Sequence, residues 1–293
     1  MKRLAAFGGL VPLLPAAVLL AVVVVLPMLR VAELGLFHVN LDGTTAGFAG
    51  LSHVTRLWTD ERWWAALRNT AVFTLLSVAA ETVLGLLFAL ALHRRFRGRG
   101  LVRAAVLLPW ALPTAVMALA WAWIFNDSFG VANDLLRRIG LLESPIAWLG
   151  EPATAMAALV VADVWKTTPF VALIVLAGLE GLPQELVDAA RVDGLSAGAR
   201  LRHVVLPLVS PSLGIAVAFR ALQAWGAFDI VYVMTGGGPG GSTETVSLFV
   251  FQSYFRYLDF GYGSAAAVQG VLLAALLAAI VVGLASRRRR APA

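Results

Sequence analysis

The chain has 293 residues, of which 60% are hydrophobic and only 14% are charged, and its mean hydropathy is +0.83. A soluble domain carries about 25% charged residues, so this composition all but excludes a water-soluble globular protein. It also excludes a disordered chain, which needs low hydrophobicity. Because the chain has no cysteine, disulfides, thiol nucleophiles and cysteine-ligated metal sites are impossible.

Six windows are long and apolar enough to cross a bilayer, which takes about 20 residues per helix. We therefore predict an all-α polytopic membrane protein, a single domain over residues 1–293, with spans at about 5–29, 70–92, 104–125, 154–177, 209–234 and 264–286. The first window follows a basic pair and could be a signal peptide. Its apolar run far exceeds the roughly 7–15 residues of a signal-peptide core, which favours an uncleaved span.

The positive charge of the chain gathers in short runs beside these windows. Lys2 and Arg3 precede the first span, five arginines and no acid lie between His93 and Arg103, and four arginines occupy 287–290. Short cytoplasmic loops are enriched in Lys and Arg, so we expect both termini in the cytoplasm. The net charge of +6 then meets anionic lipid headgroups, and we expect no nucleic-acid partner.

Two outer segments carry local signals. Thr59-Asp60-Glu61 is a plausible helix start, and we predict an interfacial helix over about 59–68 with Trp63 and Trp64 at the headgroup level. The glycine-rich stretch 235–241 is typical of turns, and we expect no fixed secondary structure there.

The inner segment 178–207 is longer than the other inner loops and is not simply basic. We predict two short helices, at about 183–192 and 196–205, broken at Gly194, since glycine takes a positive φ without strain. Pro183 suits a first helical turn and Ser196 suits a cap. The segment is either a stiff connector or a docking element for a cytoplasmic partner.

A family resemblance is found in this segment. Asp188-Ala189-Ala190, Gly194 and Val204-Val205-Leu206-Pro207 resemble, in order and spacing, the EAA motif in membrane subunits of binding-protein-dependent ABC importers. The chain has Asp188 where the family usually has Glu, and Val204 where it usually has Ile. The segments 163–170, 228–232, 235–239 and 260–263 look like the carbohydrate branch, of maltose or trehalose type. The resemblance covers roughly residues 60–286.

The resemblance implies a division of labour. This chain would be one half of a pore in a bacterial or archaeal cytoplasmic membrane, completed by a second, related permease as a heterodimer. Two cytoplasmic ATPase subunits would drive it and an external solute-binding protein would deliver the sugar. The ATPase contacts would be made by Glu185, Asp188, Ala189, Ala190, Arg191, Gly194, Leu206 and Pro207.

The sequence also indicates, independently of the resemblance, that ATP is hydrolysed by a separate subunit. A P-loop needs a lysine in a Gly-rich turn, and neither lysine of the chain, Lys2 or Lys166, has that context. We therefore expect no enzyme activity, no catalytic residue and no cofactor in this chain, with ATP and Mg²⁺ bound by the partner ATPase. The four histidines show no metal-ligand spacing, so no metal site is predicted.

Ionisable residues inside the predicted spans point to the interior of the bundle, because a charge facing lipid is costly. Glu81, Lys166 and Arg220 lie near the midplane of three different spans. At 100° per residue, Asp163, Lys166, Thr167, Phe170 and Ile174 share one face, and so do Arg220, Gln223, Ala224 and Ala227. Asp229 points away from the second face and is expected to be a structural contact. These charges either form a structural salt bridge or line a substrate path.

Carried over from the maltose-type resemblance, the sugar contacts correspond to Thr167, Phe170, Arg220, Gln223 and Ala227, to which we add Lys166 as a candidate. An aromatic ring with amide and guanidinium donors suits a sugar, although Phe170 is equally compatible with ordinary packing. The rival interpretation is a proton-coupled secondary transporter using Glu81, Asp163 or Asp229. That interpretation leaves the EAA-like segment unexplained. A second rival, an intramembrane enzyme, is disfavoured because the spans contain neither a His-Glu-x-x-His motif nor a Gly-x-Ser-x-Gly motif.

Overall fold

The computed structural model describes residues 14–94 and 96–290, the last seven without their side chains. This part of the chain contains five helices long and apolar enough to cross a membrane, or six if one sharply bent pair is a single span. The prediction of an all-α polytopic membrane protein is confirmed. Lys2, Arg3, Arg95 and positions 5–13 of the first predicted span lie outside the described residues.

The chain divides into two compact units. One unit contains the described residues up to 63 together with 249–272, and the other contains 64–248 together with the residues from 273 onward. Helices α5 (Glu61–His93) and α15 (Phe260–Arg290) contribute residues to both units.

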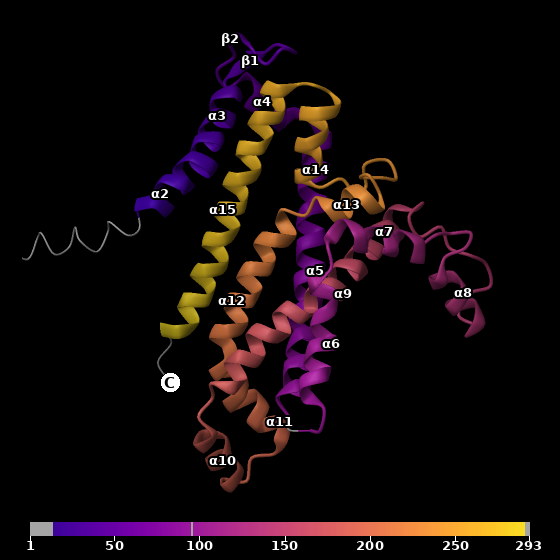
Figure 1. The fold of residues 1–293 in the computed structure, drawn as a ribbon, viewed down its shortest axis with the longest axis vertical. Coiled ribbons are helices and arrows are strands. Elements are labelled where there is room, and N and C mark those ends of the chain that lie inside the picture. Colours follow the sequence, from indigo (N-terminus) through magenta and orange to yellow (C-terminus); the bar gives the residue numbers. More distant parts are fainter. Residues whose placement is uncertain (1–13, 95, 291–293) are drawn as a thin grey trace, which may run out of the picture. The chain divides into compact units, whose positions relative to one another are not determined.

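The first unit begins with an apolar span formed by α2 (Leu14–Leu20), a π-helical turn η2 (Ala21–Val25) and α3 (Leu26–Leu34). The span thus ends at Leu34 rather than at 29. An antiparallel hairpin that the sequence analysis missed follows (Figure 1), formed by β1 (Phe37–Val39) and β2 (Thr45–Phe48). Its turn uses Asp42, whose carboxylate accepts the Thr44 amide at 2.9 Å, and Gly43 at φ +81°. Asp-Gly is a known hairpin signal.

The predicted interfacial helix over 59–68 is wrong. Helix α4 (Ser52–Thr59) ends where it was expected to begin, and residues 61–68 form the first turns of the 33-residue helix α5. Asp60 separates the two helices, and its Oδ1 accepts the Arg62 amide at 2.8 Å. The second span therefore begins at Glu61 rather than 70. The first unit also contains the π-helical turn η4 (Gln252–Arg256), which follows α14 (Val246–Phe251), and the start of α15.

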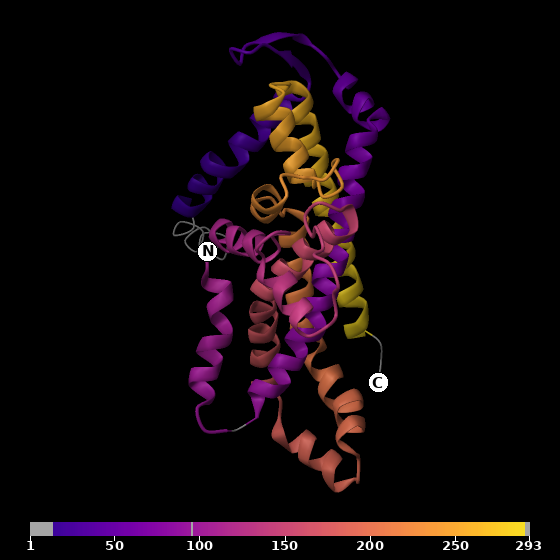
Figure 2. The same ribbon diagram turned by 90° about the vertical axis from the view of Figure 1, so that its right-hand side faces the viewer.

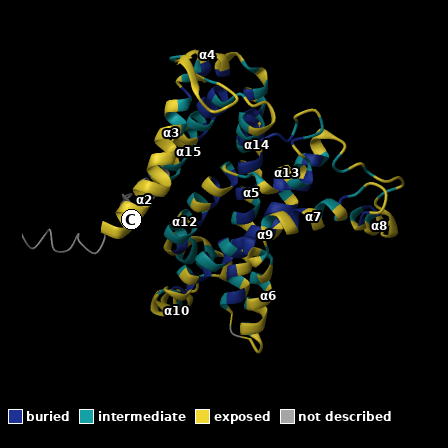
Figure 3. Cartoon of the chain, turned by 45° about the horizontal axis from the view of Figure 1, so that its top comes forward, coloured by how far each residue is buried: buried dark blue, intermediate teal, exposed yellow. Residues whose placement is uncertain are grey.

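Helix α9 (Pro152–Glu180) is the centre of the second unit, and Figure 3 shows it mostly buried. It packs against α12 (Leu206–Trp225) and α6 (Arg99–Ala111). An apolar core joins α5, α9 and α12 through Ala89, Leu92, Val171, Val175, Leu176, Leu179, Val209 and Ala216. Small residues let these backbones approach closely: a Cβ on Gly85 would lie 2.6 Å from Cγ1 of Val171.

The third predicted span, 104–125, is not one straight helix. Helix α6 ends at Ala111, α7 (Thr114–Ile124) begins at Thr114, and the two are bent by 91°. Pro113 explains the break, because a proline has no N–H to donate and forces the preceding residue out of the helical region. Leu112 accordingly has ψ 140°. The outer segment that follows contains α8 (Val131–Arg138).

The fifth predicted span, 209–234, is also wrong at its end. Helix α12 stops at Trp225, and a separate short helix α13 (Asp229–Met234) follows. Gly226, a poor helix former, stands at the break. Helix α13 packs against α7, so the two short helices that follow the two breaks lie together. The glycine-rich stretch 235–241 contains no helix or strand, as expected, but the loop is held in place: Asn69 Nδ2 donates to the carbonyls of Gly241 and of the nearby Glu244 at 2.9 and 3.1 Å.

The inner segment forms the connection between α9 and α12 (Figures 1 and 2). Its first helix, α10 (Gln184–Val192), agrees with the prediction, and Gly194 has φ +80° as expected. The second predicted helix, 196–205, is not separate. Helix α11 (Ala197–Arg200), capped by Ser196, continues through a π-helical turn η3 (Leu201–Val205) into α12, giving an uninterrupted 29-residue helix over Ala197–Trp225.

Candidate functional site

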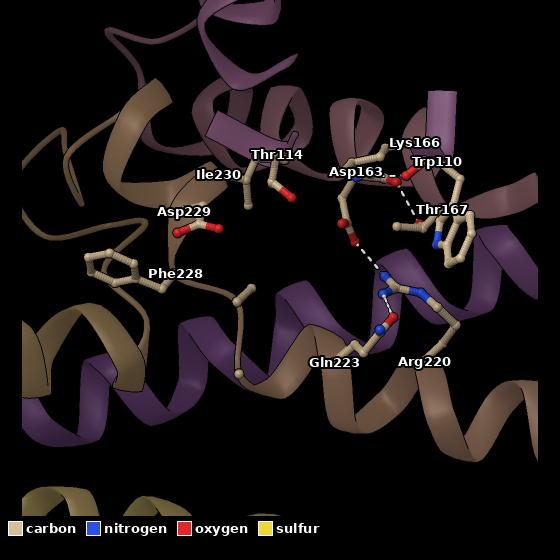
Figure 4. A pocket seen from close by; sticks show the side chains of 12 residues that line it. Trp110, Thr114, Asp163, Lys166, Thr167, Arg220, Gln223, Phe228, Asp229 and Ile230 are labelled. Atoms are coloured by element: carbon tan, nitrogen blue, oxygen red, sulfur yellow. Dashed lines mark hydrogen bonds and ion pairs between the residues drawn. The ribbon is translucent and has the colours of Figure 1, made fainter. Parts of the chain in front are cut away.

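A cavity of about 430 Å³ opens in the second unit between the two helix breaks (Figure 4). Its size falls in the usual range of small-molecule sites, about 300–1,000 Å³. One wall is the α6–α7 break, a second is the unbroken α9, and a third is the α12–α13 break. The lining residues are Trp110, Thr114, Asp163, Lys166, Thr167, Arg220, Gln223, Gly226, Ala227, Phe228, Asp229 and Ile230.

Arg220 is the centre of the polar network at this cavity. Its Nε donates to Oε2 of Glu81 at 2.6 Å, and its Nη2 donates to Oε1 of Glu81 and Oδ2 of Asp163, both at 2.9 Å. Nη1 donates to Oε1 of Gln223 at 2.8 Å. Figure 4 shows Asp163 and Gln223 directed at the guanidinium. Four hydrogen bonds to three side chains leave Arg220 little freedom of orientation.

Glu81 lies behind Arg220 and does not line the cavity. Its side chain is 0% exposed, and Oε1 also accepts the hydroxyl of Thr167 at 2.7 Å. The network therefore joins α5, α9 and α12, and it places together Glu81, Asp163, Thr167, Arg220 and Gln223, which the sequence analysis had singled out on three separate spans. Two carboxylates share one guanidinium, so each buried charge has a partner, as burial in an apolar medium requires.

Lys166 lines the cavity but bonds elsewhere. Its Nζ donates to the main-chain carbonyls of Leu112 at 2.9 Å and Trp110 at 3.4 Å, at the α6–α7 break. The residue is 8% exposed.

Two expectations about the cavity wall are corrected. Asp229 was expected to point away from the face of Arg220, yet it lines the same cavity, because the break after Trp225 resets the helical phase that the expectation assumed. Phe170, a candidate sugar contact, is absent from the lining. Its ring stacks against Trp110 with centroids 5.8 Å apart and packs on Phe219 at 4.8 Å.

The residues that sequence reasoning missed come mostly from the two breaks: Trp110, Thr114, Gly226, Phe228 and Ile230. Pro113 and Gly226 were the available signals, since both disfavour a continuous helix. Within the described part of the chain, no cluster of three His, Asp or Glu side chains could hold a metal ion.

The inner segment presents its motif residues to the surface. Asp188 and Arg191 are 66% and 71% exposed, with Oδ1 and Nη1 3.9 Å apart. Glu185, Ala189, Gly194 and Pro207 are exposed, Leu206 is half-buried, and Ala190 is buried. Exposed apolar side chains accompany them on α10, with Leu186 at 48% and Val192 at 86%.

Comparison with known proteins relates this chain to membrane subunits of transport systems. The family described as binding-protein-dependent transport system inner membrane component matches residues 81–291. The trehalose/maltose transport system permease protein MalF of Thermococcus litoralis is 42% identical over 265 residues, covering 89% of this chain and 87% of that protein. The sulfoquinovosyl glycerol transport system permease protein SmoG of Agrobacterium fabrum is 40% identical over 257 residues, covering 87% and 83%. The trehalose transport system permease protein SugA of Mycobacterium tuberculosis is 38% identical over 255 residues, covering 87% and 80%.

Among solved structures, a chain of a bacterial ABC transporter involved in the import of the acidic polysaccharide alginate superposes with a TM-score of 0.82. The match covers 98% of this chain and 96% of that one at 19% sequence identity. At this identity the likeness shows a shared fold and nothing about function.

Proposed function

We propose, from the premise that this chain belongs to the family of binding-protein-dependent transport system inner membrane components, that it forms half of the path by which an ABC importer carries a disaccharide across the membrane. As such a permease, the chain is a transport subunit and not an enzyme, and ATP is hydrolysed by a separate subunit.

The observation that carries the proposal is the cavity between the two helix breaks. Irregular backbone at membrane depth is tolerated only where it is buried in protein or lines a water-filled space. Here two breaks meet at one cavity, with a fixed guanidinium, an amide, carboxylates and an indole ring on its walls. Such groups match the hydroxyls and the C–H face of a sugar.

The printed names of the relatives support a sugar as the substrate. Two of the three are named for trehalose or for trehalose and maltose, and the third for a sulfoquinovosyl glycerol. A disaccharide of the trehalose or maltose kind is therefore the first substrate to test.

The inner segment 178–207 is proposed to dock the ATPase. Its motif residues are exposed on α10 and around Gly194, and they stand beside exposed Leu186 and Val192, so a groove of a partner could cover both kinds of side chain. The complete transporter would then comprise this chain, a second permease, two ATPase subunits and an external binding protein. Both termini would be cytoplasmic, on the same side as the inner segment.

The test is uptake by the assembled transporter. The chain would be purified with its companions from the native host and reconstituted in vesicles with the solute-binding protein. ATP-dependent uptake of labelled trehalose or maltose, unchanged by a protonophore, is the expected result. Uptake that needs a proton gradient and no ATP, or recovery of the chain without an ATPase, would overturn the proposal. ATP-dependent uptake restricted to other solutes would overturn the disaccharide alone.

A further inference from the structure

The break between α6 and α7 leaves main-chain carbonyls that need donors. The last carbonyls of any helix lack partners within it, and at this break Pro113 supplies no N–H. Leu112 and Pro113 are both extended, with ψ of 140° and 132°. Carbonyls at membrane depth cannot turn to bulk water, so their partners must come from the protein or from a water-filled cavity.

Lys166 of α9 fills this need. Its ammonium donates to the carbonyl oxygens of Leu112 and Trp110, two of those left at the end of α6. A cation is also electrostatically favoured at a helix C-terminus, where the peptide dipoles leave partial negative charge. Asp163, the acid one turn earlier on α9, accepts from Arg220.

A second contact from the next turn of α9 holds the same end of α6. The ring of Phe170 stacks on that of Trp110, with an interplanar angle of 27°. Residues four apart on a helix face the same way. Lys166 and Phe170 therefore both contact Trp110: Lys166 donates to its main-chain carbonyl and Phe170 stacks on its ring. Trp110 and Thr114, on either side of the break, both line the cavity.

We infer that Lys166 is a positioning residue: it holds the α6–α7 break so that Trp110 and Thr114 form the cavity wall, and it does not serve as a contact for the sugar. Only the transport measurement described below rests on the proposed function. The shape of the break itself can be followed independently of any substrate.

The test uses the absence of cysteine from the chain. The Thr114→Cys variant of this chain carries its one thiol at the break, and after labelling of the complete transporter in vesicles by a maleimide, the label is measured on this chain once it has been separated from its partners. In the sugar-free complex, Lys166→Met should raise the labelling rate about tenfold, because the half-buried position 114 becomes more accessible when the charged hydrogen bonds that hold the break are lost. Lys166→Arg should restore the rate, because its guanidinium can also donate to two carbonyls.

Transport provides the second measurement. Lys166→Met should raise the KM for sugar, and Lys166→Arg should return it toward the wild-type value in parallel with the labelling rate. A thiol at Leu141, which follows α8 and is 68% exposed, is the matched control and should label equally in all variants. If the Lys166→Met complex cannot be purified, Lys166→Leu replaces it, with the same expected rise in the labelling rate and in the KM.

An unchanged labelling rate at Thr114→Cys combined with a raised KM would overturn the inference, since it would make Lys166 a direct sugar contact. An unchanged rate with an unchanged KM would overturn it as well. A wild-type complex that transports no disaccharide but still shows the labelling change would refute the proposed substrate and leave the positioning role supported.

Discussion

Arg220 and Glu81 form a two-point ion pair between α12 and α5, with Nε bound to Oε2 and Nη2 to Oε1 at 2.6 and 2.9 Å. Both side chains are almost fully buried, at 4% and 0% exposure. This geometry fixes the plane of the guanidinium, so that its remaining donors are directed at Asp163 and Gln223 on the cavity wall. Glu81 therefore orients Arg220 without touching the cavity.

Removing one partner of this pair should destabilise the fold strongly. Glu81→Leu leaves a buried guanidinium without its main partner, which costs about 3–5 kcal/mol in soluble proteins. The triple variant Glu81→Leu/Asp163→Asn/Arg220→Met should recover most of the loss, because all three charges of the network are then gone. Unfolding of the detergent-solubilised chain by titration with SDS compares the two variants with the wild-type chain.

The exposed pair Asp134–Arg138 on α8 is the control for this experiment. Its side chains are 56% and 73% exposed at a separation of 2.9 Å, so Asp134→Ala should change the free energy of unfolding by only about 0–1 kcal/mol. Equal effects at Glu81 and Asp134 would contradict the buried network.

A second prediction concerns the contact between α5 and α9. A Cβ added at Gly85 would lie 2.6 Å from Cγ1 and 2.7 Å from Cβ of Val171, far inside van der Waals contact. Gly85→Ala should force the two helices apart at a cost of about 1–3 kcal/mol. Gly100→Ala on α6, where nothing lies within 4 Å of the new methyl group, should not destabilise. The same SDS titration compares them, and a harmless Gly85→Ala would argue against the close approach.

The third prediction addresses coupling to the ATPase. Gly194 has φ +80°, and a methyl group added there would meet no atom within 4 Å, so any effect of a side chain comes from backbone strain and not from a clash. Gly194→Val should break the turn between α10 and α11, since a β-branched residue rarely adopts this conformation. We expect membrane insertion to be normal and sugar uptake to fall at least about tenfold, given a strain of roughly 1–3 kcal/mol.

The control for Gly194→Val is Gly198→Ala, on α11 with free space around it. Uptake and ATP hydrolysis are measured on the same vesicles. Normal uptake by Gly194→Val would refute the proposed role of this turn, and equal loss in both variants would show that the segment tolerates no substitution.

The fourth prediction concerns the cavity. Gln223 lines the cavity and accepts from Nη1 of Arg220, so Gln223→Ala removes a polar group from the proposed sugar path and is expected to leave the fold intact. We expect the KM for sugar to rise about fivefold, the effect of losing one neutral hydrogen bond, worth about 1 kcal/mol, between the amide and a sugar hydroxyl. Leu222→Ala, one residue away and outside the cavity lining, should leave the KM unchanged. A KM unaffected by Gln223→Ala would remove Gln223 from the substrate path.

The helix content and the pairing of polar faces were predictable from the sequence, because hydrophobic runs and the 100° period are local properties. Asp163, Thr167, Arg220 and Gln223 were placed on inward faces in this way, and the structure brings them to one cavity. The family, too, was recognisable from the spacing of the Asp188–Pro207 motif, and the comparison with known families confirms it.

The helix breaks were not predictable from hydropathy, because an apolar run looks the same whether it continues straight or bends at Pro113 or Gly226. Asp229 was misplaced for this reason: its direction was inferred along a helix that in fact ends at Trp225. The hydrogen-bond acceptors of Lys166 could not be predicted either. They are main-chain carbonyls, which every residue has, and they are available only because the helix breaks at this point.

The unbroken helix from Ala197 to Trp225 has a mechanical consequence. At 1.5 Å per residue it is about 42 Å long, and it runs from the turn at Gly194 to the cavity wall, with Arg220 near its far end. A tilt of about 5° about the Ala197 end would sweep the Trp225 end through about 4 Å, from the same rise per residue. A small rotation imposed at the inner segment would therefore become a larger displacement at the other end of the helix, where Arg220 is paired with Glu81.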